Sequence, residues 1–261
     1  MNRRKALISF GVLGGVIGGA LIIEDLNMKR LEPKGYRIPA DLHIHLSKKA
    51  NPEDLVHLLS QPGLVGLARS TAEDKYLDYA TIRKYPNFKE IDPEILGVFE
   101  NAGSFGRGSF GYVLNVQEIM ADHHISAIGC KYPIGNIRDA KEAIREIRKQ
   151  NGIAILNHPF VVPSGKLFPP SEIGYRYIND KEKREIESLA SEIDEVETFN
   201  GQCINLIPLL INKEDANDLA RNYARHYQGR FKGIATSDAH FEFDQVLTSG
   251  IYIKKNGLTF K

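Results

Sequence analysis

The stretch IRDAKEAIREIRKQNGIAIL, residues 137–156, decides the fold class of this chain. Up to Gln150, alanine and isoleucine recur at helical spacing and the charged residues occupy the opposite face, which predicts an amphipathic helix. Asn151 and Gly152 follow where a helix commonly ends. The next four residues, 153–156, are too few for a helix and are apolar on both faces, which is typical of a buried parallel strand. The stretch is therefore a helix–strand unit of an α/β fold.

The same alternation extends in both directions from this unit. Strands are predicted at residues 37–46, 64–68, 95–99, 125–129, 196–199, 233–236 and 250–253, and further helices at residues 181–193 and 213–227. Alternation of this kind predicts βα units around a parallel sheet, in which the chemistry sits at the carboxyl ends of the strands.

The composition describes an ordinary globular protein that is long enough for one large core. The chain has 261 residues, of which 42% are hydrophobic, and its net charge is +1. Because the charge is so small and tryptophan is absent, we expect no extended nucleic-acid groove. The two cysteines, Cys130 and Cys203, lack CxxC spacing, which excludes a thiolate zinc site of the zinc-finger kind. Any metal ion must therefore be held by histidine and carboxylate.

Residues 1–30 form a segment distinct from residues 31–261, which we expect to be one hydrolase domain. Three basic residues precede an uncharged run, residues 6–23, of a length that could cross a membrane as a hydrophobic helix. A membrane anchor is favoured over a cleaved export signal and over a buried helix, and its orientation is left open. GxxxG spacings in this run could pair two such helices as a weak homodimer, although glycine is common in membrane segments. We expect the protein to be anchored to a membrane, or exported if the segment is cleaved.

Histidines and carboxylates gather at the ends of the predicted strands. Asp41, His43 and His45 lie on one face of the first strand, because side chains alternate with a period of two. The other strand ends carry these groups: Glu100, His124, His158, Glu197, Asp238 and His240. As a set they are better explained by a shared metal site than by separate core histidines that each find their own hydrogen-bond partner.

Several motifs occur in the order typical of the polymerase-and-histidinol-phosphatase (PHP) family, which the chain resembles over roughly residues 36–253. They are DLHIH at 41–45, GVFE at 97–100, HISAIG at 124–129, NHP at 157–159 and SDAH at 237–240. The resemblance implies a distorted TIM-like (β/α)7 barrel, preceded here by the N-terminal hydrophobic helix. It also implies a cluster of metal ions that hydrolyses phosphate esters.

The resemblance also assigns the metal ligands. One ion would be held by His43, His45, Glu100 and Asp238. Glu100 would bridge to a second ion, which His124 and His158 complete. Imidazole and carboxylate ligands suit Zn, Mn or Fe. Two such ions about 3.5–4 Å apart can generate a hydroxide at neutral pH and flank the phosphorus atom.

Two departures from the family pattern fall on a third ion, so we expect two ions. Residues 46–51 contain no further histidine, and residues 69–72 read RSTA where relatives carry Thr-Asp-His. His240, a ligand of the third ion in the family, could then contact a phosphate oxygen or act as general acid beside Asp238. Arg69 could replace the missing metal charge, since a guanidinium binds phosphate bidentately. Asp41 and Glu197 are expected behind the ligands, with Glu197 accepting a ring N–H from a ligand histidine.

The function predicted from these residues is a two-metal phosphoesterase acting on a small phosphorylated substrate, either a phosphomonoester or a nucleotide-type ester. Two alternatives stay open. An amidohydrolase-like deacylase also uses an HxH motif and a late aspartate. A catalytically degenerate metal-binding module would explain the loss of the third-ion ligands.

Overall fold

The computed structural model of the chain describes the backbone of residues 5–9, 20–24, 36–48, 63–71, 76–84, 88–92, 96–100, 110–163, 175–203, 215–240 and 250–254. The strands of the main sheet are β3 (Tyr36–His45), β4 (Gly63–Ser70), β5 (Phe88–Asp92), β6 (Leu96–Glu100), β7 (Phe110–Met120), β8 (His124–Ile128), β9 (Ile153–Leu156), β12 (Glu195–Asn200), β13 (Ile234–Thr236), β14 (Ala239–His240) and β15 (Ile251–Lys254). Two small sheets pair β1 (Lys5–Ser9) with β2 (Ala20–Glu24) and β10 (Val161–Pro163) with β11 (Tyr175–Tyr177). The helices are α2 (Tyr79–Ile82), α3 (Ala140–Lys149), α4 (Asp180–Leu189) and α6 (Ala216–His226), with a 3-10 turn, η2, at Gly201–Cys203.

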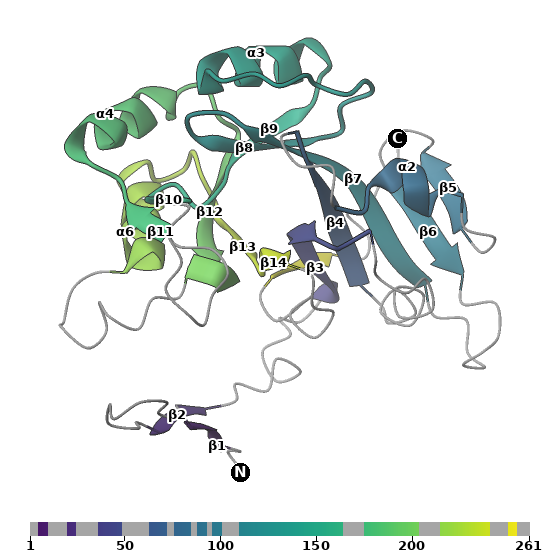
Figure 1. Cartoon of the computed structure of the whole chain (residues 1–261), viewed down its shortest axis with the longest axis horizontal. Coiled ribbons are helices and arrows are strands. Elements are labelled where there is room, and N and C mark those ends of the chain that lie inside the picture. The colour runs from purple at the N-terminus through teal and green to yellow at the C-terminus, as the bar shows by residue number, and fades with distance from the viewer. Residues whose placement is uncertain are drawn as a thin grey trace.

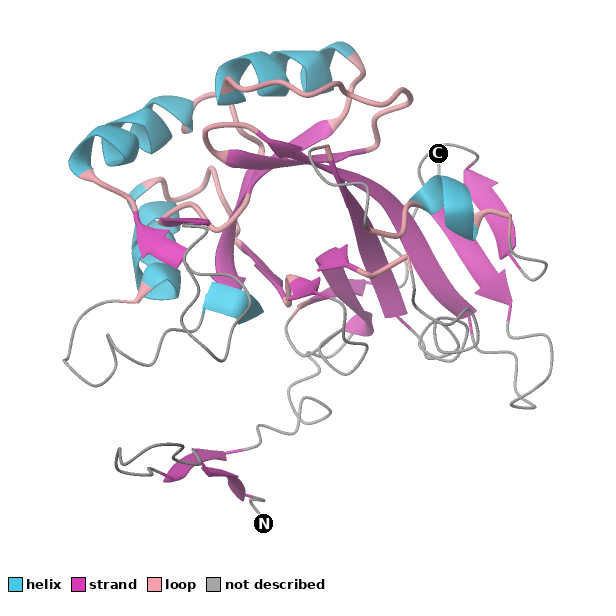
Figure 2. Ribbon diagram, in the orientation of Figure 1, coloured by secondary structure: helices cyan, strands magenta, loops and turns pink. Residues whose placement is uncertain are grey.

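The main sheet is strongly curled (Figures 1 and 2). Its strands follow the order β13-β12-β9-β8-β7-β4-β3-β14, with β15 paired to β3 and the β5–β6 hairpin paired to β7. The first and last strands of this path, β13 and β14, are separated in the chain only by Ser237 and Asp238. The curl therefore brings the two ends of the sheet together at Asp238.

The prediction of a TIM-like (β/α)7 barrel is wrong. That fold needs parallel strands, each followed by a helix, whereas β7 runs antiparallel to both β6 and β8, and β8 runs antiparallel to β9. The physical reason lies in the connections, because only residues 121–123 join β7 to β8. A parallel pair needs a crossover of a dozen or more residues, while a link this short permits only an antiparallel pair.

The predicted N-terminal hydrophobic helix is also wrong within the described residues. β1 and β2 pair antiparallel, with Lys5 opposite Glu24 and Ser9 opposite Ala20. Glycine disfavours helix by about 1 kcal/mol per residue relative to alanine, and this run contains several. Across the part of the chain that the structure describes, no helix has the length and apolar character needed to span a bilayer. The glycine spacings proposed for helix pairing lie outside the described residues.

The outer face of the curled sheet carries the main hydrophobic core. Residues of β8, β9 and β12, such as Ile125, Leu156 and Val196, are fully buried there against α3, α4 and α6. Figure 1 shows α3 and α4 lying over this part of the sheet. Asp139 caps α3, and a reciprocal capping box of Asn179 and Glu182 begins α4.

The inner face of the same sheet changes from apolar to polar along each strand. A small apolar cluster includes Val116, Ile155 and Ile234. Two residues further along, on the same face, stand the buried polar residues Glu118, Asn157 and Thr236. Because the sheet curls, the polar ends of several strands converge inside it.

Candidate metal centre

Two histidines of β3, His43 and His45, belong to the candidate metal centre. Both rings are buried, and they stand on one face of the strand because one residue separates them. Nε2 of His43 and Nε2 of His45 lie 3.0 Å apart. Two ring nitrogens that meet at this distance need a shared proton or a shared cation between them.

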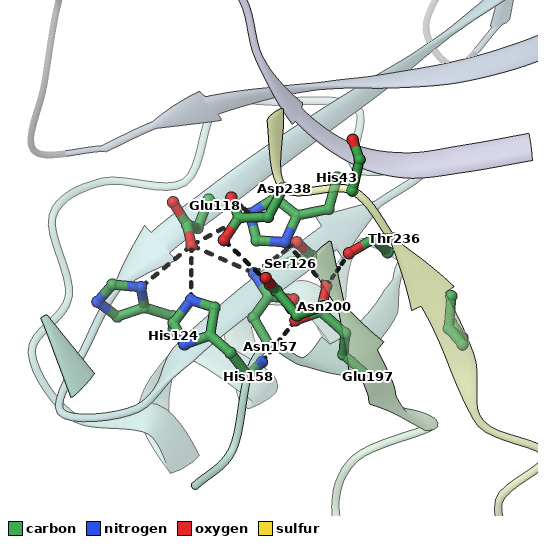
Figure 3. Close-up of polar contacts among 12 residues, drawn as sticks. His43, Glu118, His124, Ser126, Asn157, His158, Glu197, Asn200, Thr236 and Asp238 are labelled. Atoms are coloured by element: carbon green, nitrogen blue, oxygen red, sulfur yellow. Dashed lines mark hydrogen bonds and ion pairs between the residues drawn. The ribbon is translucent and has the colours of Figure 1, made fainter. Parts of the chain in front are cut away.

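Glu118 of β7 lies at the middle of the centre and is buried (Figure 3). Its Oε2 is 3.2 Å from Nε2 of His45, and its Oε1 is 3.1 Å from Nδ1 of His124. Oε1 also lies 3.4 Å from Nε2 of His43 and 3.7 Å from Nε2 of His158. One carboxylate therefore contacts four histidines that come from β3, β8 and the end of β9.

Asp238 lies where the two ends of the sheet meet, with its φ at +51°. Its buried Oδ1 accepts no hydrogen bond from the described residues. That oxygen is nevertheless 3.5 Å from Nε2 of His43 and 3.7 Å from Nε2 of His45. Two ligands of one tetrahedral ion lie about 3.4 Å apart when each bond is near 2.1 Å. The spacing around Oδ1 fits ligands of a metal ion better than hydrogen-bond partners.

The centre contains three overlapping groups that could hold a metal ion. They are His43 with His45 and Glu118, His45 with Asp238 and His240, and Glu118 with His124 and His158. Glu118 and His45 each belong to two of these groups. The donor set of imidazole and carboxylate fits Zn, Mn or Fe.

Glu197 of β12 contacts two histidines of the centre, although it belongs to none of the three ligand groups. Its Oε1 is 3.1 Å from Nδ1 of His43, so the ring can donate there and leave Nε2 for the centre. Its Oε2 accepts the backbone N–H of His158 at 2.6 Å. His158 has a φ of +24°, which a non-glycine residue rarely adopts, and the bond to Glu197 holds it there.

Two buried asparagines orient the carboxylates, and the sequence analysis did not single them out. Nδ2 of Asn200 donates to Oε2 of Glu197 at 2.9 Å and to Oδ2 of Asp238 at 3.0 Å. Nδ2 of Asn157 donates to Oγ of Ser126 at 2.9 Å and lies 3.3 Å from Oε1 of Glu118. A carboxylate that is held by an amide keeps its remaining lone pairs directed at the centre.

Asp41 contacts the centre indirectly through Ser237. The backbone N–H of Ser237 donates to Oδ1 of Asp41 at 3.0 Å, and the Ser237 hydroxyl donates to Oδ2. This contact fastens the chain just before Asp238 to β3. Asp41 therefore supports the position of Asp238 and lies apart from the three ligand groups.

The charges of the centre balance one another. Burial lowers the pKa of His43, but the negative charges of Asp238 and Glu197 raise it by more, so its pKa lies well above the usual 6.5. Burial raises the pKa of Glu118, but the charge of His45 and other histidines lowers it by more, to well below 4.5. Without metal, these two pKa shifts favour a protonated His43 beside an ionised Glu118.

The structure brings together five of the six predicted ligands of the two ions, and His240 lies with them. The five are His43, His45, His124, His158 and Asp238. The backbone of Glu100, at the end of β6, pairs with Phe110, eight residues before Glu118 on β7. The side chains of Glu100 and Arg69 lie outside the described residues.

Glu118 takes the central position that the sequence analysis assigned to Glu100. Its signal was present in the alternation of Val116, Glu118 and Met120, where a carboxylate occupies the apolar face of a strand. No strand was predicted at residues 110–120, so this carboxylate was overlooked.

No protein-family model matches the chain, and no curated protein shows significant similarity to it. The resemblance to the PHP family therefore rests on the short motifs alone.

Proposed function

We propose that the protein hydrolyses small phosphate esters at a centre of two divalent metal ions. The observation that carries the proposal is the position of Glu118 between two groups of histidines. Its Oε2 faces His45, whereas its Oε1 faces His124 and His158 and also lies 3.4 Å from Nε2 of His43. A carboxylate that is shared in this way is the usual bridge between two ions in phosphoesterases.

The residues of the chain would hold and orient the reacting groups. When bound, the ions would supply a hydroxide at neutral pH and neutralise the charge of the phosphate. Glu197 keeps Nδ1 of His43 protonated, so that Nε2 is the atom that can serve as ligand. Asn157 and Asn200 hold the carboxylates of Glu118 and Asp238 through their amide groups.

His240 fits the role of ligand or proton acceptor better than that of general acid. Its Nδ1 lies 2.8 Å from the backbone oxygen of Asp238 and must donate, because a carbonyl oxygen only accepts. Burial lowers the pKa of His240, and the charge of nearby His45 adds to this, although Asp238 opposes it. The neutral ring with a proton on Nδ1 has none left on Nε2.

Solvent exposure indicates the side from which a substrate would approach. The side chains of His240 and His124 are 16% and 10% exposed, whereas His43 and His45 are each 2% exposed. A phosphate group would therefore enter between His240 and His124, with its ester substituent in solvent. Arg69, which pairs in register with Gln117 of β7, stays a candidate for binding a phosphate oxygen through its guanidinium.

The test is phosphate release from a panel of phosphomonoesters and phosphodiesters by the full chain loaded with Mn or Zn. We expect metal-dependent release that His158→Ala abolishes. His226→Ala, which removes an exposed histidine of α6, is the matched control and should retain full activity. Absence of release with either metal would favour the metal-binding module, and cleavage of amide substrates instead would favour the deacylase. An Arg69→Ala variant with unchanged kcat and KM would remove Arg69 from the mechanism.

A further inference from the structure

The neighbouring histidines His123 and His124 lie in different surroundings. His124 contacts Glu118 in the metal centre, whereas His123 lies with Glu185 of α4 in a pocket of about 240 Å³. The pocket lies beside the first turn of α3 and is also lined by Asp122, Asp139, Lys141 and Ser188. It is therefore a second polar site, on the helical side of the sheet.

His123 is buried, with 4% of its surface exposed, yet its Nε2 has no hydrogen-bond partner among the described residues. The nearest carboxylate oxygen, Oε2 of Glu185, lies 3.7 Å away. That separation is too long for an N–H···O hydrogen bond. The 3.7 Å separation is close to the separation of about 3.4 Å between two ligand atoms of one tetrahedral ion. A ligand–metal–ligand angle slightly wider than tetrahedral would account for the difference.

The charges around this pair favour a cation. Asp122, Asp139 and Glu185 contribute three carboxylates to the pocket, against the ammonium group of Lys141 in its lining and that of the exposed Lys181, which lies 3.6 Å from Oε1 of Glu185. Lys141 lies 3.7 Å from Glu192, which partly offsets its charge. Oδ1 of Asp122 accepts the backbone N–H of Ala140 at 2.9 Å, which fastens the start of α3 to the turn that carries His123. The walls of the pocket are thus held by backbone contacts.

We propose that Nε2 of His123 and Oε2 of Glu185 bind a divalent cation, with water completing its coordination. Imidazole with carboxylate suits zinc among the common ions. Such an ion would join α4 to the start of β8, next to His124. The proposal is independent of catalysis at the inner centre, because none of the three inner ligand groups includes His123 or Glu185.

The experiment measures bound zinc in the full chain by equilibrium dialysis at micromolar free zinc, together with hydrogen exchange over residues 180–189. We expect zinc to slow exchange in α4 of the unaltered chain. Glu185→Gln and His123→Gln should each bind one ion fewer per chain and lose that slowing. Glu187→Gln makes the same chemical change at an exposed position two residues along α4 and should behave like the unaltered chain.

The variant His158→Ala distinguishes zinc bound at the inner centre from zinc bound at this site. That variant should bind less zinc in total but keep the zinc-dependent slowing of α4. The proposal is overturned if Glu185→Gln binds as many ions as the unaltered chain. It is also overturned if zinc leaves exchange over residues 180–189 unchanged in the unaltered chain.

Discussion

The two faces of the wall formed by β8, β9 and β12 use alternate residues of the same strands for different purposes. On the outer face, Leu156 and Val196 are fully buried among the side chains of three helices. On the inner face, the adjacent residues Asn157 and Glu197 are buried just as deeply but contact polar groups. Burying apolar surface stabilises the fold, whereas burying a charge costs free energy unless it is paired. Substitutions one residue apart should therefore separate stability from metal binding.

The largest effect is expected at the shared carboxylate of the inner face. Glu118→Gln keeps the shape of the side chain but removes the charge that faces four histidines. We expect metal affinity to fall by more than about 100-fold, since removing groups behind the ligands already costs 10- to 100-fold. Isothermal titration with Mn or Zn measures this.

The comparison with Glu100 sharpens that prediction. Glu100→Gln should change metal affinity by no more than about twofold, because the main chain of Glu100 pairs with Phe110, far along β7 from the centre. An equal loss in both variants would restore Glu100 to the ligand set.

On the outer face, Leu156→Ala should lower the free energy of unfolding by about 2–5 kcal/mol. The side chain is fully buried in the core, so its loss leaves a cavity. Urea unfolding of the metal-free chain measures the change. Metal affinity of the protein that remains folded should be unaltered, and a matching loss of affinity would show that the two faces are not independent.

Behind the ligands, Glu197→Gln should weaken metal binding by about 10- to 100-fold. The variant loses the charge that holds Nδ1 of His43 and that accepts the backbone N–H of His158. Glu195→Gln is the control, because Glu195 lies on the same strand but outside the centre. Its carboxylate accepts hydrogen bonds from the backbone N–H groups of Lys232 and Gly233. Similar affinities in the two variants would contradict the positioning role of Glu197.

The smallest effect is a shift in the pH of maximum stability. The raised pKa of His43 contributes stability that is complete below 6.5 and is lost as pH rises through the folded value. The lowered pKa of Glu118 contributes stability that is complete above 4.5 and is lost as pH falls through the folded value.

We therefore expect the metal-free chain to be most stable between about pH 4.5 and 6.5. Metal binding must displace the protons of His43 and His158, so the metal-loaded chain should reach its maximum at a higher pH. Thermal unfolding with and without Mn, scanned from below this range to well above it, measures both maxima. Identical pH profiles with and without metal would contradict proton displacement at these histidines.

Local elements could be predicted wherever their signal is local. The strand predicted at residues 153–156 is β9, and the helix predicted at residues 137–150 contains α3. A capping aspartate, a helical apolar face and the Asn151-Gly152 stop all lie within a few residues of one another, so long-range contacts are not needed to define them.

The direction of the strands could not be predicted in this way. Alternating helices and strands suggested a parallel barrel, but β7 pairs antiparallel with β6 and β8 over long stretches. No strand was predicted between residues 100 and 124, so the hairpin from β7 to β8 was missed. An error about one strand therefore became an error about the fold and about the central carboxylate, Glu118.

The sequence by itself determined that His43 and His45 share a face, because a strand alternates with a period of two whatever surrounds it. It also determined that any metal ion must be held without thiolates. Only the tertiary structure decided that Glu118 joins the histidines, that Asp238 lies where the sheet closes, and that His123 lies beside Glu185. Those outcomes depend on pairing between strands and helices distant in the chain, and the register of such pairs is set by packing of the whole sheet rather than by neighbouring residues.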